Sequence, residues 1–279
     1  MSADDTSPVI VGVGRYTYKD APDGGGHGPR ISLRDMIVES VARAAGDAAQ
    51  TSGSAADILA AVEAVGCPGT FFTGVADGVC RRADMPQVYP NLPASVAKAA
   101  GATNADSFYY TIASGSSPQY FINKFGEEIA QGKRECVLIA GGEVLMSSKK
   151  MGAMGKRMKP EDADEVHAML AEWHDDTGAP PPEMIAVEEA VMKAMGSAPL
   201  EAAHGLGAPV ATYPIFEQAL RRELGHSLEE HQSYVARICE EMTQMAALPE
   251  NAEHAWFPEV QSAESIMEPS ADNRYIGFP

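Results

Sequence analysis

Apolar and polar residues along residues 106–142 follow an order that predicts a strand, a turn, a helix and a second strand. Residues 107–111 (Ser-Phe-Tyr-Tyr-Thr) are rich in side chains that favour β-structure. The small residues 113–117 predict a sharp turn. Ser117 followed by Pro118 is typical of a helix N-cap with proline at the first helical position.

The predicted helix carries a single apolar stripe. Its members recur at spacings of three and four residues: Phe121, Ile122, Phe125 and Ile129. Gly132 is expected to end the helix. The continuous apolar run at residues 136–140 then predicts a strand buried on both faces, as in a parallel sheet covered by helices.

The preceding residues repeat this alternation. Residues 8–16 and 62–67 are predicted as buried strands, and helices are predicted at residues 33–49, 55–61 and 94–100. Ser32 and Asp35 have the spacing of a helix cap. The order of elements predicts an α/β fold with a doubly wound parallel sheet.

Gly12 and Gly14 also match part of a dinucleotide-binding fingerprint. The third glycine is replaced by Thr17, and no helix follows directly. Packing of a buried strand is the preferred interpretation.

Beyond residue 146 the pattern becomes mainly helical. Helices are predicted at residues 161–174 and 183–195, then from residue 213, and from a capping box at Ser227 and Glu230 to about residue 247. We therefore expect two domains, an α/β domain at 1–146 and a helical loop domain at 147–279.

A basic stretch opens this second domain in an otherwise acidic chain. Lys149, Lys150, Lys156 and Arg157 are its candidates for binding the phosphate groups of a ligand. A solvated surface loop is the alternative interpretation, because runs of charge usually face water.

The charge and hydrophobicity of the chain bear on which classes of partner it can bind. The 279 residues are 45% hydrophobic, which is enough for a sizeable core, and 39 acidic against 21 basic residues give a net charge of -18. This charge disfavours binding to nucleic acid or to anionic membranes. No apolar run approaches the roughly 20 residues that span a bilayer, and residues 2–5 do not resemble a signal peptide, so a cytoplasmic protein is expected.

Cysteine and histidine patterns indicate neither a metal site nor a disulfide framework. Cys67, Cys80, Cys136 and Cys239 are scattered. Cys67 precedes Pro68 and Gly69 at a predicted strand end, where either a catalytic or an ordinary core cysteine is possible.

The string Ile112-Ala113-Ser114-Gly115-Ser116-Ser117, together with residues 130–132 and 140–143, resembles the nucleophile region of the thiolase superfamily. The likeness is to sterol-carrier-protein thiolases and to thiolase-like proteins named acetyl-CoA acetyltransferases. It extends over nearly all of the chain and implies the N-terminal half and the loop domain of a thiolase-like layered fold. The second half of that fold is expected to be absent.

In that family a cysteine nucleophile opens the helix, and here Ile112 occupies its position. An aliphatic side chain cannot form a covalent acyl intermediate. Six of the seven histidines match no family motif: His167, His174, His204, His226, His231 and His254. No catalytic residue is therefore assigned. Ser114, Gly115, Ser116 and Ser117 remain candidates for contacting a thioester oxygen at the helix N-terminus.

The resemblance implies an acyltransferase-like protein that handles or binds an acyl-CoA thioester. A non-catalytic thiolase-like subunit that binds acyl-CoA or a partner chain is the alternative. Coenzyme A is expected as substrate or ligand, without another cofactor. We also expect a homodimer or a complementing thiolase-type chain, with residues 107–111 resembling the strand through which thiolase sheets pair.

Overall fold

The computed structural model describes residues 7–19, 31–51, 53–70, 88–144, 160–185, 203–206 and 209–268, without the side chains of 160–166 and 209–211. The chain divides into two compact units, Met1–Val187 and Glu188–Pro279, which are described separately below. The domain boundary expected at residue 146 falls outside the described residues.

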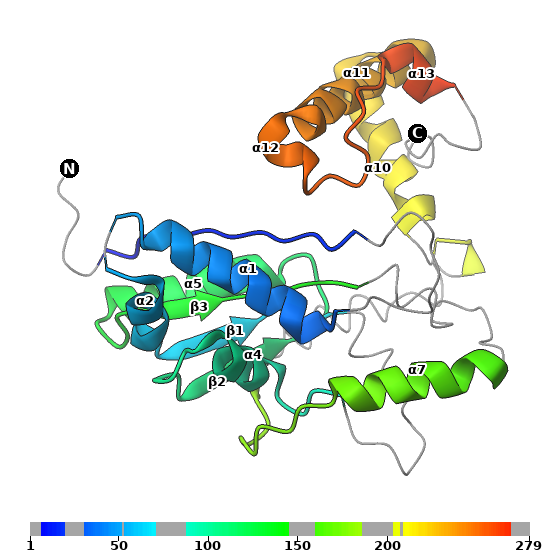
Figure 1. Ribbon diagram of the computed structural model, residues 1–279. Coiled ribbons are helices and arrows are strands. Elements are labelled where there is room, and N and C mark those ends of the chain that lie inside the picture. The colour runs from blue at the N-terminus through cyan, green and yellow to red at the C-terminus, as the bar shows by residue number, and fades with distance from the viewer. Residues whose placement is uncertain are drawn as a thin grey trace. The chain divides into compact units, whose positions relative to one another are not determined.

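A parallel sheet of four strands forms the centre of the first unit (Figure 1). Its strands are β1 (Ala64–Cys67), β2 (Ser107–Thr111), β3 (Val137–Ile139) and β4 (Glu183–Ile185), in the order β3-β1-β2-β4. Ala64 pairs with both Ser107 and Val137, and Tyr109 pairs with Glu183. The α/β class predicted from the alternation of elements is confirmed.

The helices within the described residues of this unit are α1 (Leu33–Ala48), α2 (Ala55–Ala61), α4 (Leu92–Ala100), α5 (Ser117–Ala130) and α7 (Pro160–Trp173). Local signals fix their ends. The Ser32 side chain accepts a hydrogen bond from the Asp35 N–H and starts α1. Gly101 ends α4 and Gly132 follows α5, with φ values of 87° and 67° that favour glycine.

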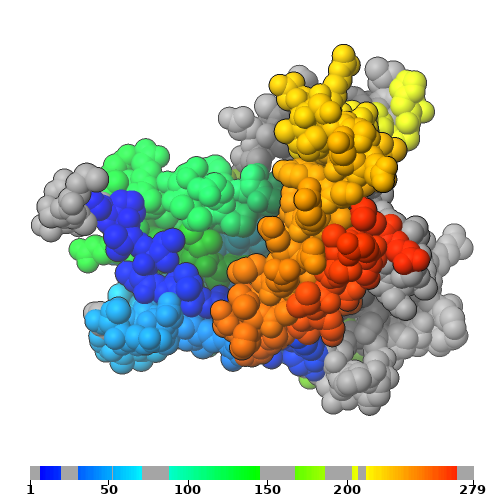
Figure 2. Space-filling view, turned by 90° about the horizontal axis from the view of Figure 1, so that it is seen from above, coloured from blue at the N-terminus to red at the C-terminus, as the bar shows by residue number. Residues whose placement is uncertain are grey.

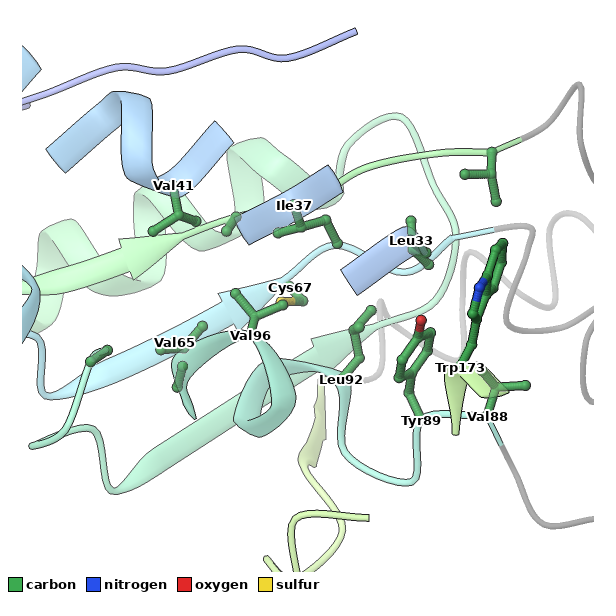
Figure 3. Close-up of a cluster of buried hydrophobic side chains, with 14 of the residues drawn as sticks. Leu33, Ile37, Val41, Val65, Cys67, Val88, Tyr89, Leu92, Val96 and Trp173 are labelled. Carbon is green, nitrogen blue, oxygen red and sulfur yellow. The ribbon is translucent and has the colours of Figure 1, made fainter. Parts of the chain in front are cut away.

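One face of the sheet is covered by α1 and α4 (Figure 3). Val65 and Cys67 of β1 point into this cluster, where they lie among Leu33 and Ile37 of α1 and Val96 of α4. All five side chains are at most 1% exposed. This cluster is the larger part of the core.

The opposite face is covered by α5. Phe121 and Phe125 stack with ring centroids 5.7 Å apart, and Phe125 meets the Tyr109 ring edge-on. Gly66 of β1 lies under both phenylalanines and leaves room for their rings. Ile122, expected on the same apolar stripe, is instead 47% exposed.

The predicted buried strand at residues 8–16 is wrong. The stretch belongs to no sheet, and Val9, Ile10, Val11 and Val13 are 59–80% exposed. Figure 2 shows it in deepest blue on the surface of the first unit.

The stretch packs against α1 and does not pair with a strand of the sheet. Gly12 and Gly14 lie against the backbone of α1 so closely that a Cβ on either would overlap it, and the Val13 N–H donates to Asp47 at 2.9 Å. The two glycines thus serve close packing on a helix, and no phosphate-binding turn forms from them.

Two other expectations need correction in the sheet. The helix predicted at residues 183–195 begins as a strand, because β4 pairs with β2 at Glu183–Ile185, while residues 186–195 lie outside the described chain. The resemblance implies that residues 107–111 pair with a second copy across a dimer. In the structure β1 and β4 occupy both edges of β2.

The described part of the second unit contains α10 (Pro209–Leu224), α11 (Leu228–Ala247), α12 (Pro249–Ala252) and α13 (Ala263–Met267). The predicted capping box of Ser227 and Glu230 opens α11. His231 of α11, 2% exposed, links it to Glu217 of α10 through a 2.8 Å contact from Nε2. None of the helices within the described ranges is long and apolar enough to cross a bilayer.

Candidate functional site

The turn between β2 and α5 lies at the carboxyl-terminal ends of the parallel strands. The loop after β1 is packed on it: the Gly69 N–H donates to Thr111 Oγ1 at 3.0 Å, and the Thr70 N–H donates to the Tyr110 hydroxyl at 3.2 Å. A Cβ on Gly69 would overlap the Thr111 carbonyl oxygen, so glycine permits this approach. Two strand ends therefore fix the position of the turn.

Ile112 begins the turn and is half-buried. Its carbonyl oxygen accepts two hydroxyl hydrogen bonds, from Thr111 Oγ1 and from Ser117 Oγ, both at 3.0 Å. The backbone at this position is therefore well fixed. The side chain supplies neither a nucleophile nor a proton donor.

The helix starts one residue earlier than predicted. Ser116 is the N-cap of α5, with a helical φ of −88° and no side-chain capping bond, and Pro118 is the second helical residue. Ser117 is fully buried inside the first turn because its hydroxyl bonds back to Ile112. The expectation that Ser117 is the N-cap is wrong for this reason.

The sequence-predicted contact residues differ in availability. Ser114 and Ser116 are linked through their hydroxyls at 3.0 Å, and the Ser116 N–H also contacts Ser114 Oγ at 3.3 Å. Gly115 and Ser116 are exposed and Ser114 is half-buried, whereas the Ser117 hydroxyl faces the interior. Ser114, Gly115 and Ser116 can reach a ligand.

The first turn of α5 offers one further donor. The Ser117 N–H is bonded to the Ser114 carbonyl oxygen, and Pro118 has no N–H. Gln119 is exposed, and its N–H has no acceptor within the part of the chain that the structure describes. A free N–H at the positive end of a helix dipole favours an anion or a polarised carbonyl oxygen.

Neither of the two cysteines described in this unit favours a thiolate. Cys67 belongs to the core, and burial strongly raises the pKa of its thiol, which favours the core interpretation over the catalytic one. Burial and then the charge of Glu63 raise the pKa of Cys136. Cys80 lies outside the described residues.

The metal-ligand and phosphate-binding candidates add no further group to the β2–α5 turn within the described residues. Within the described ranges, no group of three or more metal-ligand side chains gathers. The candidate phosphate-binding residues Lys149, Lys150, Lys156 and Arg157 lie outside the described residues. The contacts of Gly69 and Thr70 with the turn were not predicted, since only the strand end at Pro68-Gly69 was visible as a signal.

Comparisons with known proteins identify no relative: no family model, no curated protein and no solved structure matches the chain.

Proposed function

We propose that the chain is a thiolase-like protein that binds an acyl-CoA thioester at the β2–α5 turn. The observation that carries the proposal is the strand–turn–helix unit itself, in which the parallel strand β2 ends at Thr111, Ile112 begins the turn and the exposed Ser116 is the N-cap of α5. The exposed Gln119 N–H and the Ser114 and Ser116 hydroxyls supply donors for a thioester oxygen.

Ile112 determines whether the turn can take part in covalent acyl transfer. Acyl transfer through a covalent intermediate needs a nucleophile at the turn, and an aliphatic side chain is none. The proposed activity at residue 112 is thus noncovalent binding, with coenzyme A as part of the ligand and no other cofactor. Lys149, Lys150, Lys156 and Arg157 are proposed to contact its phosphates.

A non-catalytic subunit is the second candidate, and Ile112 favours it. In this role the chain binds acyl-CoA or a complementing thiolase-type chain, and reactive groups come from elsewhere. Both candidates predict that this polypeptide does not cleave acetoacetyl-CoA with free CoA, because Ile112 offers no nucleophile. Turnover clearly above a heat-killed control would contradict both and would support a catalytic acyltransferase, whereas binding of a complementing thiolase-type chain would favour the subunit. The cytoplasmic location stays a prediction.

Two substitutions of one residue test the binding site. Ser116→Asp places a negative charge at the N-terminus of α5, and Ser116→Asn is the neutral control of nearly equal shape. Both are good N-caps, so neither is expected to destabilise the helix. Calorimetric titration with acetyl-CoA is expected to show binding to the wild type and to Ser116→Asn.

The aspartate is expected to weaken this binding by about tenfold relative to the asparagine, because only the aspartate places a negative charge beside the Gln119 N–H, where it repels the anionic ligand. Equal affinities of the two variants would place the ligand elsewhere. A wild type that binds no acyl-CoA would overturn the proposal.

A further inference from the structure

No further inference is drawn: the strongest candidate, the exposed apolar stripes of α10 (Tyr213, Phe216, Leu220 and Leu224) and α11 (Tyr234, Ile238, Met242 and Met245), carries none because nothing in the structure shows what covers them.

Discussion

The side chain at position 112 decides which chemistry the turn can perform. The backbone carbonyl oxygen of Ile112 accepts hydrogen bonds from the hydroxyls of Thr111 and Ser117. A different side chain at this position is therefore expected to keep the same place before the start of α5. The β2–α5 turn therefore allows a direct test of whether its surroundings activate a thiol.

Ile112→Cys is expected to give a thiol with a pKa below the free value of about 8.5, because it lies near the positive end of the α5 dipole. Iodoacetamide should alkylate it near neutral pH faster than Cys136 or Cys239, whose thiols have pKa values raised by burial. Mass spectrometry of digested protein measures each rate.

The substitution makes the side chain two heavy atoms smaller at a half-buried site and should cost about 1–2 kcal/mol of stability. Rates are therefore compared where circular dichroism shows the variant folded. A thiol at 112 that reacts no faster than Cys239 would mean that the helix terminus does not activate this position.

Gly66 provides a packing test at the same scale. A methyl group there would lie 2.7 Å from Phe121 Cδ1 and 2.9 Å from Phe125 Cε2, and both rings are buried. Gly66→Ala is therefore expected to lower the free energy of unfolding by about 1–3 kcal/mol, measured by urea denaturation.

Gly46→Ala is the matched control, since Gly46 is exposed within α1 and a Cβ there meets open space. It should stabilise the protein by about 0.5–1 kcal/mol through helix propensity. If Gly66→Ala unfolds at the wild-type urea concentration, the two rings do not require glycine at this position.

At the scale of elements, the carboxylate of Asp175 links the segment between α7 and β4 to the helices α1 and α4. Asp175 accepts a hydrogen bond from Ser95 of α4 at 2.8 Å and pairs with Arg34 of α1 at 3.0 Å. Burial by itself raises the pKa of Asp175, but the Ser95 hydroxyl and the Arg34 guanidinium outweigh it and lower this pKa.

A lowered pKa means that the stabilisation is complete above the unfolded-state value of about 3.9 and is lost as the pH falls from there through the lower folded-state pKa. Asp175→Asn should therefore lower stability at pH 7 by about 1 kcal/mol and flatten the acid side of the pH–stability curve. Asp176→Asn is the control, because among the described residues this neighbour accepts only the local Gly178 N–H bond. If the free energy of unfolding of the wild type and of Asp175→Asn fell in parallel at acid pH, the lowered pKa of Asp175 would be contradicted.

Elements with local signals were predictable from sequence, and elements fixed by distant partners were not. The caps at Ser32, Gly101 and Ser227 mark α1, α4 and α11 because each cap bonds within a few residues. β4 has only three residues, and its pairing with β2 is not encoded in its own neighbourhood.

The candidate site also has some features with a local sequence signal and others that depend on distant segments. Its turn between strand and helix could be located from the small residues that follow Thr111. The approach of Gly69 and the inward bond of Ser117 depend on segments brought together by folding, so no local pattern shows them.

At the scale of the whole molecule, the exposed apolar side chains favour association. Val9, Ile10 and Val11 in the first unit are each more than half exposed, as are Met242 and Trp256 in the second. Since both edges of β2 are paired, contact through that strand is closed to a second copy.

Light scattering at micromolar concentration is expected to give a mass of about twice the 29.5 kDa chain, or a larger complex when a complementing chain is present. Addition of salt should not dissociate the dimer, because the exposed groups named above are apolar. A compact, non-aggregating monomer would contradict this expectation.

The order of the strands also has a kinetic consequence. Every ladder of the sheet joins segments far apart in the chain: Ala64 with Ser107 and Val137, and Tyr109 with Glu183. Long loops must close before any of these pairings forms, and parallel pairing of this kind is slow. The capped helices can form first, on a microsecond timescale, while strand edges stay open to other chains. Yield on refolding should thus depend more on protein concentration than on helix stability.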